Sequence, residues 1–365
     1  MPVSERRAGS LTKRLITYAA VAIVLAAARG WITAAALGGR YPLRDLVFDG
    51  PAFASVVVAL VLFDTALRSG LRRLFAAGRW PNRVARHGIY ALVLPTAVFP
   101  LLLATLQLHP QRVITTQTPR DWGVDYQDVS FVSAGLRLAA WYIPARGRQR
   151  PIVLVAHGLN ADKGNFLPAA IVAHDLGYDV LSLDFRAHGE SDGRTTTLGF
   201  NEADDVKAAY DWIRTNKPDR PVFAMGYSMG GAAVITAAAK YGIFDRIVID
   251  SSFTSVESVA RMGMLRPIGP LGSVVWDLAR FWGWVWTGVD LDRRRPVDVV
   301  GSLRNRPLLF IHGTADRLIS YTESVRLRDA AGITAQLWLV DGADHVESVN
   351  RGEYKEKVGR FFSAL

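Results

Sequence analysis

Short, almost entirely apolar runs from about residue 125 onward limit most strongly what this chain can fold into. Turn residues bound each run, and helix-length stretches separate most of them. Such strands, alternating with helices, are typical of a parallel β-sheet covered by helices on both faces. The predicted fold class is therefore α/β, with strands in "PIVLVAHG", "YDVLSLDF", "PVFAMGYS", "RIVIDSS", "RPLLFIHG" and "AQLWLVDG". Before them, "YQDVSFVSAGLRLAAWYIP" predicts a hairpin that turns at 133–135.

Polar residues follow these runs where such sheets bind ligands. In open parallel sheets, ligands lie beyond the carboxyl ends of the strands. Residues 157–160, residues 186–191, Ser228, Asp316 and His345 each come just after a run. The sequence therefore predicts that the candidate catalytic residues lie together at one edge of the sheet.

Ser228 stands in "FAMGYSMGGAA", with Gly226 and Gly230 two residues away on either side. A serine hydroxyl is a poor nucleophile unless a base lies within hydrogen-bond reach. Small residues on both sides let a strand turn sharply into a helix while the serine projects. The alanine-rich stretch that follows predicts that helix. Its N-terminal potential and the Met229 N–H would favour a developing oxyanion.

Residues from about Tyr126 to Leu365 resemble the α/β-hydrolase superfamily, close to its membrane-tethered esterase, thioesterase and serine-aminopeptidase-like members. The resemblance rests on five motifs in the family order: "HGLNADKGNF", "DFRAHGESDG", "GYSMGG", "HGTADRLIS" and "GADHVES". It implies a mostly parallel central sheet, a triad of Ser228, Asp316 and His345, and no cofactor or metal. It also implies an oxyanion hole formed by the backbone N–H groups of Met229 and Leu159, with Asn160 as the alternative to Leu159.

Two assignments within the triad have competitors. Asp250 also ends a strand, and some members of the family carry the acid there, although "GTAD" is the commoner arrangement. Asp344 precedes His345 and is expected to be a turn residue. Only His345 follows the last strand; the other histidines are His87, His109, His157, His174, His188 and His312.

Residues 253–306 occupy the place where this fold usually carries its lid. The segment contains "VVWDLARFWGWVWTG", and two interpretations stay open for it. The aromatic side chains pack a helical cap, or they line an acyl pocket or touch bilayer headgroups, where tryptophan is favoured. The residues concerned are Trp276, Trp282, Trp284 and Trp286.

The N-terminal third predicts a membrane anchor of two or three spanning helices over residues 1–110. Its apolar segments are Leu15–Leu37, Phe53–Leu67 and Ile89–Leu108, and a spanning helix needs about 20 mostly apolar residues. Arg29 and Asp64 interrupt the first two segments, so whether the first one spans stays open. A cleaved signal peptide would be followed by soluble sequence, whereas two more apolar segments follow here.

Charge supports a membrane rather than a nucleic acid as the partner of this region. Residues 1–110 hold 13 Lys and Arg against 4 Asp and Glu, out of 43 and 33 in the whole chain. These cations flank apolar segments instead of covering a folded face. Arginines crowd the loop between the second and third segments: Arg68, Arg72, Arg73, Arg79, Arg83 and Arg86. The positive-inside rule keeps that loop in the cytoplasm and predicts an extracytoplasmic catalytic domain at residues 111–365.

Together these observations predict a membrane-anchored serine hydrolase that cleaves an ester, thioester or amide of a small-molecule or lipid substrate. An acyltransferase with the same triad is one alternative, and a catalytically silent membrane scaffold is another. The chain has no cysteine, which excludes disulfides and thiolate metal sites. Substrate identity and oligomeric state stay open.

Overall fold

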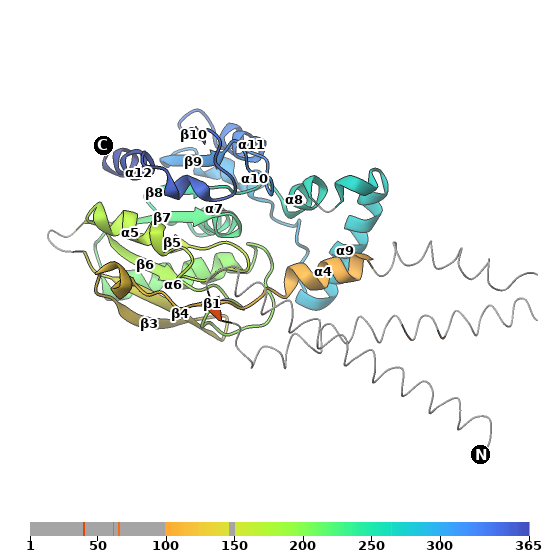
Figure 1. The fold of residues 1–365 in the computed structure, drawn as a ribbon, viewed down its shortest axis with the longest axis horizontal. Helices are drawn as coiled ribbons and strands as arrows, with labels where there is room; N and C mark the ends of the chain where they lie inside the picture. Colours follow the sequence, from red (N-terminus) through yellow and green to blue (C-terminus); the bar gives the residue numbers. More distant parts are fainter. Residues whose placement is uncertain are drawn as a thin grey trace, which may run out of the picture.

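The computed structural model describes residues 39–40, 61, 65, 99–145, 150–263 and 265–364. An eight-stranded sheet forms its centre, in the order β10-β9-β8-β7-β5-β6-β4-β3 (Figure 1). The strands are β1 (Gly39–Arg40), β2 (Ile114–Thr115), β3 (Gln127–Ser133), β4 (Leu136–Ile143), β5 (Ile152–Ala156), β6 (Asp179–Leu183), β7 (Val222–Tyr227), β8 (Arg246–Asp250), β9 (Leu308–Gly313) and β10 (Gln336–Val340). Every apolar run that the sequence predicts to be a strand forms a strand in the structure.

Strands β6, β5, β7, β8, β9 and β10 run parallel to one another. At the β6 edge, β4 and β3 join them as an antiparallel hairpin. The hairpin turns at Ala134 and Gly135, whose φ angles of 48° and 80° are positive. Ser133 pairs with Leu136 across this turn, as the sequence predicted. β1 pairs with β2 in a separate two-stranded ladder.

Helices cover both faces of the sheet, as expected for buried parallel strands. On one face, α6 and α7 pack over β5 and β7 in the larger apolar core. On the other, α5 and α12 pack over β5, β7 and β9 in a second core. The helices are α4 (Phe99–Leu108), α5 (Leu167–Asp175), α6 (Glu202–Asn216), α7 (Met229–Tyr241), α8 (Val256–Met262), α9 (Leu271–Thr287), α10 (Pro296–Val299), α11 (Thr322–Ala331) and α12 (Tyr354–Ser363), with 3-10 turns η2 (Pro119–Trp122), η3 (Arg266–Ile268), η4 (Val300–Leu303) and η5 (Glu347–Asn350).

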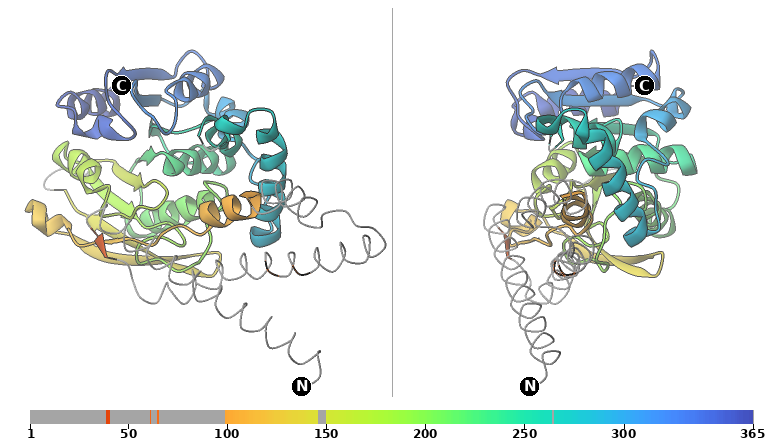
Figure 2. Two further views of the ribbon diagram at one scale, coloured as in Figure 1. Left: turned by 45° about the vertical axis from the view of Figure 1, so that its right-hand side comes forward. Right: turned by 90° about the vertical axis from the view of Figure 1, so that its right-hand side faces the viewer.

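The segment predicted to be a lid contains α8, η3, α9, α10 and η4. α9 lies beyond the end of the sheet and packs side by side with α4, away from the C-terminus (Figures 1 and 2). The two helices meet in a small apolar cluster of their own. Its buried members are Leu103, Ala104, Leu108, Leu265, Val275, Trp276, Ala279 and Leu291.

Most of the predicted membrane anchor lies outside the described residues. In the part that the structure does describe, no helix has the length and apolar character needed to cross a bilayer. α4 is the described end of the third apolar segment, and it packs against α9 although it falls within residues 1–110.

Candidate active site

Ser228 lies at a sharp corner between β7 and α7. Its backbone adopts φ 52° and ψ −118°, a conformation that costs a non-glycine residue about 1–3 kcal/mol. Two hydrogen bonds hold the corner. The Ser228 N–H donates to the Asp250 carbonyl oxygen at 2.8 Å, and the Ser252 hydroxyl donates to the Ser228 carbonyl oxygen at 2.9 Å. A strained serine fixed in this way is the arrangement that the motif predicts.

The glycines around Ser228 are required by close backbone contacts. A Cβ atom on Gly230 would lie 2.3 Å from the Ala156 carbonyl oxygen, at the end of β5. A Cβ on Gly226 would lie 2.7 Å from the Gly231 Cα atom. No side chain fits at such distances, so the strand and the helix approach this closely only with glycine at both positions.

His345 and Asp316 meet across the loops that follow β10 and β9. The His345 Nδ1 atom lies 2.7 Å from the Asp316 Oδ2 atom. The Asp316 side chain is fully buried, while the His345 side chain is 21% exposed. The other carboxylate oxygen, Oδ1, accepts the backbone N–H groups of Leu318 and Ile319 at 2.9 and 2.8 Å. Asp316 is therefore held from both sides and presents one oxygen to the imidazole.

His312 is a second partner of Asp316 that the sequence did not reveal. Its Nε2 atom lies 3.1 Å from Asp316 Oδ2 and 2.9 Å from the Ile319 carbonyl oxygen. The Ile319 carbonyl oxygen and an ionised Asp316 carboxylate can only accept hydrogen bonds, so His312 Nε2 carries the proton. Nδ1 then accepts the Ser324 hydroxyl at 2.7 Å. The only sequence signal for this role was the "HG" pair four residues before Asp316.

The charge of Asp316 follows from these contacts. Burial by itself raises the pKa of the carboxyl, but the hydrogen bonds from His312 and His345 outweigh it and leave the pKa well below its ordinary value. Asp316 is therefore an anion at neutral pH. An ionised carboxylate has no proton to donate, so the proton in the contact belongs to His345 Nδ1. His345 Nε2 is thereby left as the basic nitrogen.

Asp250, the alternative candidate for the catalytic acid, has hydrogen-bond partners other than His345. It is fully buried and accepts hydrogen bonds from the hydroxyls of Ser251, at 2.9 Å, and Ser348. Burial raises its pKa to about 6, against the opposing effect of these hydrogen bonds. The Ser251 hydroxyl also accepts the N–H of Val346 at 3.2 Å, and Val346 has a left-handed φ of 59°. Asp250 thus braces the loop that carries His345, whereas Asp316 contacts the imidazole.

Asp344 and His157 hold loops near the site in place by hydrogen bonds. Asp344 accepts the His345 N–H at 2.8 Å and pairs with Arg317 Nε at 2.7 Å, as a turn residue would. His157 is buried, and its Nε2 accepts the Phe185 N–H at 3.0 Å, which ties the loop after β5 to the loop after β6. Burial lowers the pKa of His157, consistent with a neutral structural imidazole.

Ser228 and His345 line the same cavity, of about 540 Å³, at the carboxyl ends of the strands. Among the described residues, no hydrogen bond joins the Ser228 hydroxyl to the His345 ring. Such bonds are often long in unliganded sites and shorten when substrate binds. Leu159, Asn160 and Met229 also line this cavity. Met229 is the first residue of α7, and N–H groups in a first helical turn have no partner within the helix.

The four lid tryptophans do not share one environment. Trp276 is buried and lines the cavity, and its Nε1–H donates to Asp292 at 3.1 Å. Trp282 and Trp286 pack against the cluster between α4 and α9. Trp284 points outward and is 55% exposed.

The cavity is apolar away from Ser228, and its walls include a helix that the sequence did not suggest. α4 contributes Leu103, Ala104, Gln107 and Leu108 to the lining. None of the described lining residues is Asp, Glu, Lys or Arg. Over the same described part of the chain, no group of three His, Asp or Glu side chains is placed to hold a metal ion.

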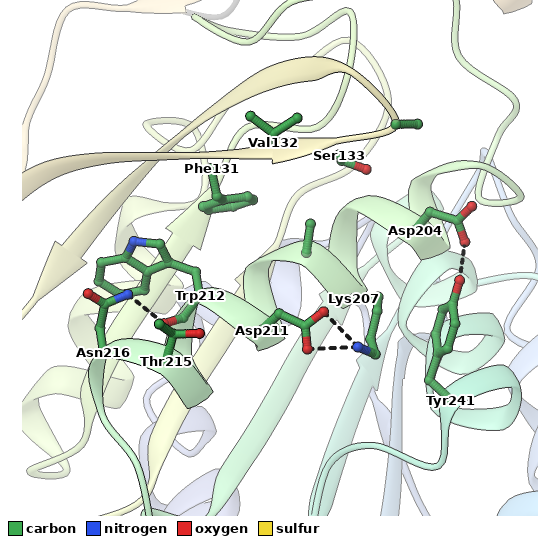
Figure 3. A pocket seen from close by; sticks show the side chains of 12 residues that line it. Phe131, Val132, Ser133, Asp204, Lys207, Asp211, Trp212, Thr215, Asn216 and Tyr241 are labelled. Carbon is green, nitrogen blue, oxygen red and sulfur yellow. Dashed lines mark hydrogen bonds and ion pairs between the residues drawn. The ribbon is translucent and has the colours of Figure 1, made fainter.

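A second hollow, of about 440 Å³, lies between the β3–β4 turn and α6, and the triad residues are not part of it. Its charged side chains have polar partners within the hollow: Lys207 Nζ contacts Asp211 at 2.7 Å, and Asp204 accepts the Tyr241 hydroxyl at 2.6 Å (Figure 3). These pairings leave the hollow without the convergent polar groups of a reaction centre.

Comparison with known proteins finds similarity to hydrolases. The family model "Serine aminopeptidase, S33" matches residues 147–294, which include Ser228 and end before Asp316 and His345. An uncharacterized protein of Mycobacterium tuberculosis, Rv2307c, is 29% identical over 229 residues, covering 62% of this chain and 72% of that protein.

Two further similarities concern proteins named for an activity. The solved structure of the Pyrococcus furiosus esterase Pf2001 is 26% identical with a TM-score of 0.59, covering 70% of this chain and 97% of that one. The lysophosphatidylserine lipase ABHD12 of Bos taurus is 30% identical over 127 residues, covering 33% of this chain and 31% of that protein.

Proposed function

Because this chain belongs to the α/β-hydrolase superfamily, we propose that it is a serine hydrolase that cleaves an acyl ester through an acyl-enzyme at Ser228. The observation that carries the proposal is the hydrogen bond from His345 to the buried, ionised Asp316, beside a strained serine that lines the same cavity. A base with a fixed tautomer beside a hydroxyl that lines the same cavity is what a serine nucleophile needs.

In the proposed mechanism, His345 Nε2 takes the Ser228 proton while Oγ attacks the ester carbonyl. The Met229 and Leu159 N–H groups stabilise the negative charge that develops on the carbonyl oxygen. The resulting imidazolium is stabilised by Asp316 and donates its proton to the leaving alcohol. Water, deprotonated by the same nitrogen, then releases the acid and restores Ser228.

The lining favours an ester over the peptide that the name of the family model suggests. An aminopeptidase must bind the free ammonium group of its substrate, and a buried ammonium needs an anionic partner. None of the described cavity residues is acidic. The relatives named as an esterase and a lipase are consistent with this preference.

We further propose that apolar segments before α4 anchor the protein in a membrane, with the catalytic domain on the extracytoplasmic side. The support is the sequence of residues 1–98 and the arginine-rich loop at 68–86. α4 itself packs on α9, and the rest of the third apolar segment, residues 89–98, is shorter than the roughly 20 residues that a spanning helix needs. The extracytoplasmic placement therefore requires α4 to take part in the crossing, and without that crossing the arginine-rich loop would leave the domain in the cytoplasm. Protease added to intact spheroplasts should cleave the domain, and its full protection until the membrane is opened would contradict this topology.

Hydrolysis of p-nitrophenyl esters by the full chain in purified membranes tests the activity. Ser228→Ala should reduce kcat by roughly 10⁴- to 10⁶-fold, as in other triads. Ser363→Ala, which removes an exposed hydroxyl at the end of α12, is the matched control and should keep the wild-type activity. Equal rates for wild type and Ser228→Ala would exclude the serine mechanism.

A further inference from the structure

The cavity beside Ser228 has two chemically different ends. The polar side chains of Asn160, Asn165, Ser228 and His345 belong to the loops at the edge of the sheet. The walls that α4, α8 and α9 provide are apolar apart from Gln107. A polar or charged acyl group would lose its water there without gaining hydrogen-bond partners, which is unfavourable. The far end therefore suits an unsubstituted hydrocarbon chain.

α4 forms one wall of that far end. Ala104 and Leu103 line the cavity from α4, and Trp276 and Ala279 line it from α9. The two helices approach closely where α9 has no side chain: a Cβ on Gly283 would lie 3.4 Å from Leu108 Cδ1. α4 precedes the residues that match the hydrolase family model. The catalytic domain thus takes part of its substrate site from outside the recognised hydrolase sequence.

The chain just after α4 is fastened to the catalytic loops. The Thr196 N–H donates to the Leu108 carbonyl oxygen at 2.9 Å, and the Gln111 N–H donates to the Asn160 side chain at 2.8 Å. The buried Arg112 guanidinium donates to the carbonyl oxygens of Gly189 and Gly193, both at 2.9 Å. These contacts fix α4 relative to the loop that carries Leu159, so its wall has a defined place beside Ser228.

We propose that the part of the cavity walled by α4, α8 and α9 is an acyl-chain site, and that the substrate is an ester of an apolar fatty acid. This inference rests on the proposed serine hydrolase activity and adds its substrate class. Burial of each methylene is worth about 0.8 kcal/mol, which corresponds to about fourfold in kcat/KM. Medium-chain esters should therefore exceed acetate esters by a factor that grows with chain length until the cavity is full.

Filling the cavity from α4 tests the site. In the full chain, in purified membranes, kcat/KM is measured for p-nitrophenyl esters from acetate to dodecanoate. Ala104→Phe should exclude two or three methylenes and lower the long-chain values roughly 15- to 60-fold. The acetate value should stay within about threefold of wild type, because acetate occupies only the polar end. Ala279→Phe fills the same space from α9 and serves if Ala104→Phe fails to fold.

Val274→Phe is the matched control, since Val274 lies on the outer side of α9 and is 49% exposed. It adds a ring to the same helix without entering the cavity and should leave the chain-length profile unchanged. If Ala104→Phe and Ala279→Phe both keep the wild-type profile, the acyl site lies elsewhere while the hydrolase activity stands. If the wild type hydrolyses none of the esters, the serine hydrolase proposal fails, and the acyl site fails with it.

Discussion

The two ends of the cavity are built from different parts of the molecule. At the end that we propose to be catalytic, called the catalytic end below, Ser228, Asp316 and His345 follow strands β7, β9 and β10, and backbone groups hold the first two in place. At the end that we propose to hold the acyl chain, called the acyl end below, α4 and α9 meet through apolar side chains in a cluster separate from both cores of the sheet. One end is fixed by directional bonds and the other by contact between hydrocarbon surfaces.

Under the proposed function, the first end would carry out the reaction and the second would select the substrate. Hydrogen bonds and backbone contacts tolerate little displacement, and misplacement by about 1 Å can cost 100-fold in rate. Apolar contacts are non-directional, so a cluster of aliphatic side chains can be repacked when the total volume is kept. We therefore expect substitutions at the catalytic end to abolish activity or stability, and substitutions at the acyl end to change mainly which substrate is preferred.

The largest effect is expected at Asp316. Asp316→Asn replaces an oxygen that accepts the His345 Nδ1 proton, so the imidazole can adopt the wrong tautomer, and kcat should fall by about 10⁴-fold. Asp250→Asn should reduce kcat much less, because Asp250 reaches His345 only through the loop it braces. Steady-state kinetics on the same ester compares the two variants. A larger loss for Asp250→Asn would assign the catalytic acid to the end of β8.

Asp250 should instead make the stability of the catalytic end depend on pH. Its folded pKa of about 6 lies above an unfolded value of about 3.9. The fold therefore binds this proton more tightly, and stability falls as the pH rises from about 4 to about 6. Burial of the ionised carboxylate costs about 3 kcal/mol above that range.

Asp250→Asn removes this dependence. The unfolding free energy of the variant relative to wild type should rise by up to about 3 kcal/mol between pH 4 and pH 7. Any loss caused by the amide itself is independent of pH and cancels in that comparison. Chemical denaturation at both pH values measures it, and a parallel response of the two proteins would show that the pKa of Asp250 is not raised by folding.

Gly230→Ala tests the rigidity of the catalytic end. Its Cβ would meet the Ala156 carbonyl oxygen at 2.3 Å, and backbone cannot move aside as a side chain can. We expect a loss of about 1–3 kcal/mol in unfolding free energy, together with loss of activity as Ser228 is displaced. Thermal unfolding and ester hydrolysis on one preparation report both, and an unchanged variant would contradict the close packing of α7 on β5.

Gly283→Ala is the counterpart at the acyl end and should have the smallest effect. Its Cβ would lie 3.2 Å from Leu291 Cδ1, at the tip of a side chain that can rotate. Alanine is also favoured over glycine in a helix by about 1 kcal/mol. The two effects oppose each other, so stability should stay within about 1 kcal/mol of wild type. A loss as large as that of Gly230→Ala would show that the two ends are equally rigid.

The positions of Ser228, Asp316 and His345 after three strands of the sheet could be predicted because their signals are local, whereas their catalytic roles stay predictions. Apolar runs bounded by turns marked the strands, and the glycines around Ser228 marked the corner. The acyl end could not be predicted in the same way. An apolar segment such as 89–108 has the same pattern whether it spans a bilayer or packs on another helix, so α4 was assigned to the anchor. Trp284 and Trp276 likewise could not be distinguished before the face that α9 buries was known.

Labelling by a fluorophosphonate, a reagent that reacts with activated serines, tests the central claim most directly. Membranes containing the full chain are treated with the reagent, and the modified peptide is identified by mass spectrometry, for wild type and for Ser228→Ala. We expect one label, on the peptide that contains Ser228, and none in the variant. A label on another serine, or undiminished labelling of Ser228→Ala, would show that Ser228 is not the nucleophile.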